Sequence, residues 1–164
     1  YLGMKYIEKH EYNGNLENGT KIERETMSNA IKSIFGPTAT YTDASATDDC
    51  PGATYDNASQ TYTVVGGCGG SLIPYYEKEI IKAVEYSDRI EIEEKALYAV
   101  PEMSDETSEV QLKLYTADQE TLLDTVSSEE KDIITKYQDK LATYKYTFKE
   151  EDGKYYFDSV ELMQ

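Results

Sequence analysis

Hydrophobic and polar positions alternate most regularly at the C-terminal end of the chain, over residues 143–162. Two runs rich in aromatic and β-branched residues flank Asp152-Gly153, a dipeptide typical of a two-residue β-hairpin turn. The cross-strand pairs predicted from this turn are Phe148 with Phe157, Tyr146 with Ser159, and Lys149 with Tyr156. The terminal hairpin is therefore the element on which the fold prediction rests.

Side chains on a strand point alternately to its two faces. One face of the hairpin is predicted to carry Tyr144, Tyr146, Phe148 and Phe157. The other is predicted to carry Lys145, Thr147, Lys149, Val160 and Leu162. We expect an apolar helix to cover the aromatic face, so that Phe148 and Phe157 are buried.

Two stretches have the helical period. The first follows Thr20-Lys-Ile-Glu23, which matches a capping box, and ends at Gly36-Pro37. Its apolar positions are Met27, Ala30, Ile31, Ile34 and Phe35. The second follows another capping-box pattern, residues 127–130, and its apolar positions are Ile133, Ile134, Tyr137 and Leu141.

Strands are predicted over most of the remaining chain. Residues 54–65 form a small hairpin, and residues 110–115 alternate as a single strand. Residues 75–86 and 89–100 are interpreted as two antiparallel strands joined near Ser87-Asp88, although 75–86 also fits a helix. A bulge is expected at Glu93-Glu94 and the end of the strand at Pro101. Near the N-terminus, the pattern offers only a short strand around Leu2–Ile7.

These elements predict an α+β fold in which a curved antiparallel β-sheet packs on one or two helices. Neither an internal repeat nor a linker is visible. We therefore expect a single domain over residues 1–164.

Charge narrows the range of partners. The chain has 16 basic and 32 acidic residues, a formal net charge of −16. Nucleic acid and anionic lipid would be repelled, so neither is an expected partner. The sequence contains no apolar run of about 18 residues, so we expect no direct membrane insertion within it.

The two cysteines, Cys50 and Cys68, stand in small, flexible surroundings and lack zinc-ligand spacing. We predict a disulfide between them, which implies an oxidising compartment and hence export to the cell exterior. The chain begins at Tyr1 and is interpreted as a mature or trimmed piece. The alternative, Cys68 as a nucleophile, needs a base, and the only histidine is His10, far away in the sequence.

Two other candidate sites, a calcium loop and a phosphate loop, do not have the residue spacing that these motifs require. The acidic loop from Asp43 to Asp49 lacks the glycine and closing glutamate of a calcium loop. Gly66–Ser71 lacks the lysine of a phosphate loop. We therefore expect no catalytic residue, no metal site and no cofactor, and the pattern does not identify ligand-binding residues. Asn18-Gly-Thr and Asn57-Ala-Ser match the glycosylation sequon, which matters only in a eukaryotic secretory route.

The C-terminal pattern from Tyr144 to Glu161 resembles uncharacterised secreted or lipoprotein domains of Gram-positive bacteria. The middle stretch from Gly66 to Tyr98, with Gly-Gly-Cys-Gly-Gly and Ile-Glu-Ile-Glu-Glu-Lys-Ala-Leu-Tyr, is similar to the same group. The resemblance implies export and a sheet that holds a helix, of the NTF2-like or cystatin-like kind. It carries no catalytic residue with it.

The leading hypothesis is a non-catalytic extracellular or cell-surface module that binds a protein or small-molecule ligand. Tyrosines could line the concave side of its sheet. One alternative is a hydrolase that uses two carboxylates, which requires a close pair in a cleft with one raised pKa. Another is a spacer domain of a surface lipoprotein, which requires a surface without a pocket or apolar patch.

Overall fold

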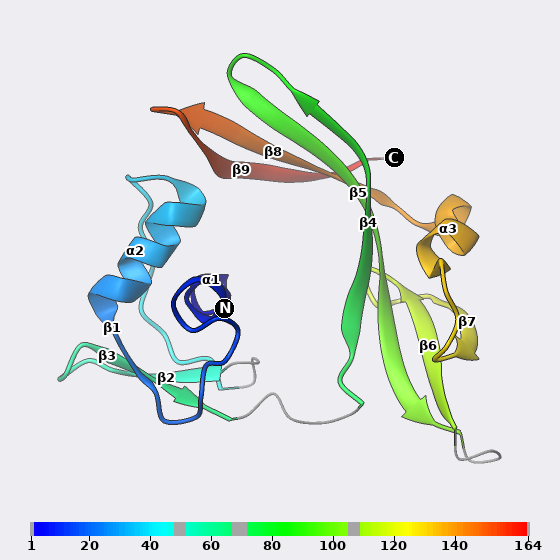
Figure 1. Cartoon of the computed structure of the whole chain (residues 1–164), viewed down its shortest axis with the longest axis horizontal. Coiled ribbons are helices and arrows are strands. Elements are labelled where there is room, and N and C mark those ends of the chain that lie inside the picture. Colours follow the sequence, from blue (N-terminus) through cyan, green and yellow to red (C-terminus); the bar gives the residue numbers. More distant parts are fainter. Residues whose placement is uncertain (1, 48–51, 67–71, 105–108, 164) are drawn as a thin grey trace. The chain divides into compact units, whose positions relative to one another are not determined.

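The computed structural model describes residues 2–47, 52–66, 72–104 and 109–163. The chain divides into two compact units, Tyr1–Gly69 (unit 1) and Gly70–Gln164 (unit 2). A single domain over residues 1–164 stays a prediction. Both units combine antiparallel strands with short helices, so the chain belongs to the α+β class (Figure 1). Each unit is described by itself.

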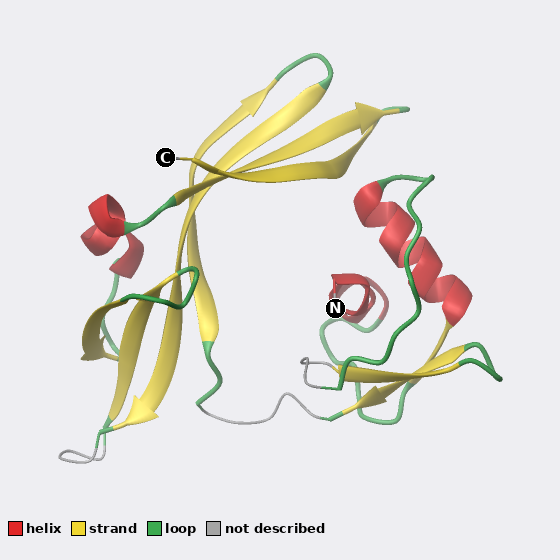
Figure 2. Cartoon of the chain, turned by 180° about the vertical axis from the view of Figure 1, so that it is seen from behind, coloured by secondary structure: helices red, strands yellow, loops and turns green. Residues whose placement is uncertain are grey.

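Unit 1 is a small sheet with two helices on one side of it (Figure 2). Its elements are α1 (Leu2–Glu11), β1 (Lys21–Glu23), α2 (Arg24–Phe35), β2 (Gly52–Asp56) and β3 (Thr61–Val65). The strand order is β1-β3-β2, with both pairs antiparallel. The buried core joins the helices to the sheet and consists of Met4, Ile7, Ile22, Met27, Ala30, Ala53, Tyr62 and Val64.

The structure corrects two predictions in unit 1. Leu2–Ile7 is helical, because α1 buries Met4 and Ile7 on one face against α2. A Cβ on Gly3 would lie 2.6 Å from the sulfur of Met27, so glycine permits this close approach. The capping box at Thr20 is also wrong: the following residues form β1, because Ile22 is buried opposite Tyr62.

Other predictions for unit 1 are confirmed. The helix with the stripe from Met27 to Phe35 is present as α2 and ends at Gly36, whose φ of 98° suits glycine. The predicted hairpin over residues 54–65 is present as β2 and β3. Cys50 and Cys68 lie outside the described residues, so their disulfide stays a prediction.

Unit 2 is a six-stranded antiparallel sheet built on one long strand. Its elements are β4 (Tyr75–Glu85), β5 (Arg89–Met103), β6 (Val110–Thr116), β7 (Leu122–Ser127), α3 (Ile133–Tyr137), a 3-10 turn (Gln138–Lys140), β8 (Thr143–Glu151) and β9 (Lys154–Met163). The long strand β5 pairs with β4, with β8 through residues 89–95 and with β6 through residues 97–103. Hence β8 and β9 extend one end of the sheet, and β6 and β7 extend the other (Figure 1).

The core of unit 2 lies at the β6–β7 end. Four buried residues after β7 — Ile133, Ile134, Tyr137 and Leu141 — pack against Leu97, Ala99, Leu112 and Leu114 of the sheet. This confirms the second predicted apolar stripe, although the helix is only five residues long. Its capping box is wrong, because the helix begins at Ile133 after Asp132, which has a left-handed backbone and makes no side-chain cap.

The antiparallel strands predicted over residues 75–100 are confirmed, and the helical alternative for 75–86 is excluded. A bulge is present at the expected position, but its extra residue lies in the other strand. It is Ile81 of β4, opposite Glu93-Glu94 of β5. Pro101 does not end β5, which continues to Met103. Pairing with β4 stops at Ala99, so Pro101 lies where β5 has become an edge strand on that side and a missing N–H is tolerated.

The terminal hairpin has the predicted turn, with positive φ at both Asp152 and Gly153. Phe148 pairs with Phe157 and Lys149 with Tyr156, as expected. Tyr146, however, pairs with Val160 rather than Ser159, because a bulge follows Phe157 in β9. That extra residue moves Val160 and Leu162 onto the aromatic face.

The second apolar stripe, with Ile133, Tyr137 and Leu141, does not cover the hairpin's aromatic face, because it packs on Leu97 and Leu114. Phe148 and Phe157 are only half-buried, and neither belongs to a buried core. The core of unit 2 forms instead at the other end of the sheet. Among the described residues, no helix is long and apolar enough to cross a membrane.

Candidate functional site

One face of the β4-β5-β8-β9 region carries most of its aromatic and aliphatic side chains. Residues directly opposite in neighbouring antiparallel strands point to the same face, so the pairing defines rows across the sheet. The rows are Glu85–Ile90–Phe148–Phe157, Ala83–Ile92–Tyr146–Val160 and Ile80–Glu94–Tyr144–Leu162. We call this surface the aromatic face.

The opposite surface of the same strands is ionic, and we call it the charged face. Its ion pairs are Lys82–Glu93 at 2.8 Å, Arg89–Glu91 at 2.8 Å, Lys145–Glu161 at 3.1 Å and Lys149–Asp158 at 2.6 Å. Side chains on this face therefore bind one another. The aromatic face differs in that most of its side chains are apolar or aromatic.

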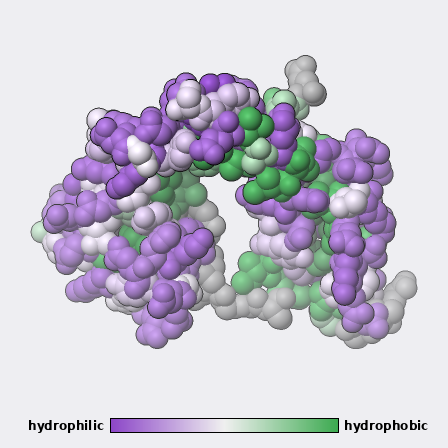
Figure 3. All heavy atoms as spheres, turned by 45° about the horizontal axis from the view of Figure 1, so that its top comes forward, coloured by the Kyte–Doolittle hydropathy of each residue, from purple (hydrophilic) through white to green (hydrophobic). Residues whose placement is uncertain are grey.

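Several apolar residues of the aromatic face are strongly exposed. Leu162 is 62% exposed, Ile80 60% and Val160 48%. The phenyl rings of Phe148 and Phe157 contact each other edge to face, with centroids 5.9 Å apart. Figure 3 shows hydrophobic residues at the molecular surface in patches bordered by hydrophilic ones. Exposed apolar surface that is rimmed by polar residues is typical of an interaction site.

A pocket opens on this face where the tyrosines gather. Its volume is about 240 Å³, and its lining consists of Tyr76, Lys78, Glu94, Ala96, Ala117, Tyr144 and Tyr146. Ala96, the only one of these that is buried, has too small a side chain to fill the space between the rings. The pocket is smaller than the roughly 300–1,000 Å³ of typical ligand sites, so it fits one side chain or one ring.

The polar groups of the pocket are partnered. The Tyr146 hydroxyl donates to Glu94 at 3.1 Å, and the Lys78 ammonium lies 3.6 Å from the same carboxylate. Gln119 donates to the Tyr76 hydroxyl at 2.9 Å, and the Tyr76 ring lies 5.0 Å from that of Tyr98. These contacts hold the rings in place beside a fixed carboxylate and a fixed ammonium.

Two of the pocket tyrosines, Tyr144 and Tyr146, have raised pKa values and stay protonated at neutral pH. Burial raises the pKa of Tyr146 to about 12, and the Glu94 carboxylate adds to this rise. Burial also raises the pKa of Tyr144, with a smaller contribution from Asp118. A neutral phenol with such a pKa donates hydrogen bonds but exchanges no proton near pH 7, so the pocket is suited to binding.

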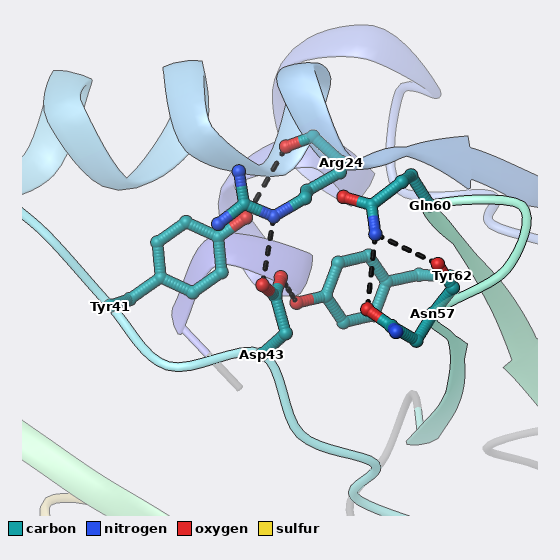
Figure 4. Close-up of polar contacts among 6 residues, drawn as sticks. All are labelled: Arg24, Tyr41, Asp43, Asn57, Gln60 and Tyr62. Carbon is teal, nitrogen blue, oxygen red and sulfur yellow. Dashed lines mark hydrogen bonds and ion pairs between the residues drawn. The ribbon is translucent and has the colours of Figure 1, made fainter.

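A second cluster lies in unit 1, around Asp43 (Figure 4). The Arg24 side chain donates to Asp43 at 2.8 Å, and the Tyr62 hydroxyl donates to the same carboxylate at 2.6 Å. The Tyr41 hydroxyl donates to the backbone carbonyl of Arg24 at 3.2 Å. These contacts lower the pKa of Asp43, mainly through Tyr62. They hold the loop that contains Asp43 against α2 and β3.

The loop closes over an apolar cavity of about 240 Å³, lined mainly by methionine, alanine, isoleucine and tyrosine side chains. Asp43 is the first residue of the acidic loop whose spacing does not match that of a calcium-binding loop. In the structure, an arginine and a tyrosine occupy its two oxygens, so this carboxylate serves to fix the loop.

The sequence identified part of this arrangement. The alternation of Tyr144, Tyr146 and Phe148 correctly placed them on one face, but no ligand-binding residue was named. Tyr76 and Glu94 were missed, because only the pairing of β4 and β8 with β5 brings them beside Tyr144. His10 lies in the last turn of α1, with its ring 4.2 Å from that of Tyr6.

Comparison of the chain with known protein families, with curated proteins and with solved structures finds no match.

Proposed function

We propose that the chain is a non-catalytic, exported binding module and that the aromatic face of unit 2 is its binding surface. The observation that carries the proposal is a sheet face with exposed aliphatic and aromatic side chains and a tyrosine-lined pocket. Export rests on the predicted Cys50–Cys68 disulfide and on the resemblance to secreted and lipoprotein domains. An NTF2-like or cystatin-like sheet is the finer architecture that the proposal assumes.

The carboxylate hydrolase is less well supported. A general acid at neutral pH needs a carboxyl group with a raised pKa. In the described part of the chain, each carboxyl group whose pKa is shifted has it lowered. These groups are Asp43, Asp56, Glu91, Asp118 and Asp124. The spacer alternative requires a surface without a pocket or apolar patch, and the aromatic face has both.

The test is a binding screen read by NMR on the protein with labelled tyrosine rings. Soluble glycan fragments and short peptides of differing charge serve as probes. We expect at least one probe to shift the signals of Tyr144 and Tyr146. The double variant Tyr144→Ala/Tyr146→Ala should weaken that binding about tenfold or more, as expected for loss of central aromatic contacts.

Tyr156→Ala is the matched control, because Tyr156 lies on the same hairpin but pairs with Lys149 on the charged face. It should bind with unchanged affinity. The proposal fails if no probe perturbs the aromatic face, or if the purified protein hydrolyses a glycan, ester or peptide at enzymatic rates.

A further inference from the structure

The aromatic face is bordered by carboxylates. Glu85 lies in the same row as Ile90 and Phe148, and Glu94 lies beside Tyr144. Each accepts a hydrogen bond of 3.1 Å from a tyrosine, Glu85 from Tyr155 and Glu94 from Tyr146. Negative charge is thus held within reach of the ring surfaces, and the Lys78 ammonium, 3.6 Å from Glu94, offsets part of it.

Unit 2 also carries most of the charge of the chain. Its sequence, residues 70–164, has 23 Asp and Glu against 11 Lys and Arg, which gives −12 of the total −16. A potential of this sign attracts cationic partners and repels anionic ones. A second copy of the chain, nucleic acid and an anionic membrane are all disfavoured as occupants of the face.

The spacing of the rings fits an extended polypeptide. Tyr144, Tyr146 and Phe148 alternate along β8, so neighbouring rings are about 6.6–6.8 Å apart along the strand. An extended peptide lying on the face repeats its own alternate side chains at the same interval. Its apolar side chains can therefore meet successive rings in register.

Basic side chains add to this fit. A lysine or arginine can place its methylene stem on a tyrosine ring and its charged end against a neighbouring carboxylate. Cations over aromatic rings are attracted by the negative ring face. Resting on the proposed function, we propose that the aromatic face binds an extended peptide segment of a partner protein. In this segment the side chains at every second position point toward the face, and they include both apolar and basic residues.

The test uses isothermal titration calorimetry with the full chain and three short peptides. One carries leucine and lysine in turn at every second position with serine between them, the second is the same peptide acetylated on every lysine, and the third has glutamate in place of lysine. We expect the lysine peptide to bind at least about tenfold more tightly than the acetylated one at low salt. Its affinity should fall about tenfold at roughly 0.5 M salt, where surface charges are screened. The glutamate peptide should not bind.

Three variants locate the effect. Glu85→Gln/Glu94→Gln keeps the side-chain shapes and should weaken the lysine peptide several-fold, with little change for the acetylated one. Tyr144→Ala/Tyr146→Ala should weaken both peptides, and Tyr156→Ala should weaken neither. Equal binding of the lysine and acetylated peptides, or salt-independent binding, would overturn the inference.

A neutral glycan that binds the aromatic face more tightly than the lysine peptide would also overturn this inference, but it would leave the proposed function standing. If neither peptide nor glycan perturbs Tyr144 and Tyr146, the proposed function fails together with the inference. The two failures are therefore distinguishable.

Discussion

The two ends of the unit 2 sheet have similar apolar content and opposite burial. At the β6–β7 end, α3 and Leu141 cover Leu97 and Leu114, which are fully buried. At the β8–β9 end, Phe148 and Phe157 remain half-buried, and Leu162 is more exposed than either. The comparison teaches that burial in this sheet depends on the element that lies over a face, because apolar residues are present at both ends.

This difference has an energetic consequence. A fully buried side chain leaves a cavity when it is truncated, whereas a half-exposed one leaves a space that water or neighbouring side chains can fill. Truncations at the covered end should therefore destabilise the protein more than truncations at the open end.

Leu114→Ala, at the covered end, should have the largest effect. Leu114 is fully buried beneath the α3 region, so its truncation should lower the free energy of unfolding by about 2–5 kcal/mol. Urea unfolding followed by circular dichroism measures this loss. A change below about 1 kcal/mol would mean that the covered end is not the core of unit 2.

Phe148→Ala, at the open end, should cost less than a fully buried phenylalanine. Its ring contacts Phe157 edge to face but is only partly buried, so we expect a loss of roughly 1–2 kcal/mol against about 3–5 kcal/mol for a core position. Urea midpoints at an unchanged m value give the answer. A loss as large as that of Leu114→Ala would remove the distinction between the two ends.

Lys149→Ala tests the charged face of the open end. Lys149 is 64% exposed on its side chain and pairs with Asp158 at the surface, so the loss should be below about 0.5 kcal/mol. Raising the salt concentration should reduce even this difference. A larger loss than that of Phe148→Ala would show that the charged face stabilises the hairpin more than the aromatic face does.

Tyr137→Phe tests the covered end through the pH dependence of the stability. The Tyr137 hydroxyl donates to Asp124, and this bond is the largest cause of the lowered pKa of that carboxyl group. A folded-state pKa below the unfolded value of about 3.9 stabilises the protein above that value. The stabilisation is lost as the pH falls through the folded pKa.

The stability difference between the wild type and Tyr137→Phe should therefore be present at neutral pH and shrink as the pH falls below about 4. Urea midpoints measured from pH 7 to pH 2 follow it. Asp124→Asn is the control and should lose this pH-dependent part together with the smaller part that comes from the Thr125 N–H. A difference that stays constant with pH would mean that the bond to Asp124 does not contribute through ionisation.

The sequence predicted those features that depend on neighbours along the chain. Asp152-Gly153 specified its turn, and the alternation of Tyr144, Tyr146 and Phe148 specified their shared face. The pairing of Tyr146 was missed because a bulge in β9 changes the register, and nothing in the local pattern marks one extra residue.

Features that depend on distant residues were not predictable. Thr20 and Ser127 both begin capping-box patterns, yet no helix starts at either. Pairing of Ile22 with β3 outweighs the local cap signal in the first case. The pocket is likewise non-local, since Tyr76, Glu94 and Tyr144 come from three strands. For the same reason, the apolar stripe of the second helix did not by itself show that this helix packs on the β6–β7 end of the sheet.

The bulge at Ile81 is relevant to the tendency of the protein to aggregate. Within the described chain, β4 pairs with β5 alone, so no described strand pairs with the backbone N–H and C=O groups of its outer edge. A long, regular edge of this kind is a template for aggregation. The extra residue interrupts its hydrogen-bonding repeat midway, and Lys78 and Lys82 stand on either side of the interruption. The protein can thus expose an apolar sheet face while the adjoining edge resists the growth of fibrils.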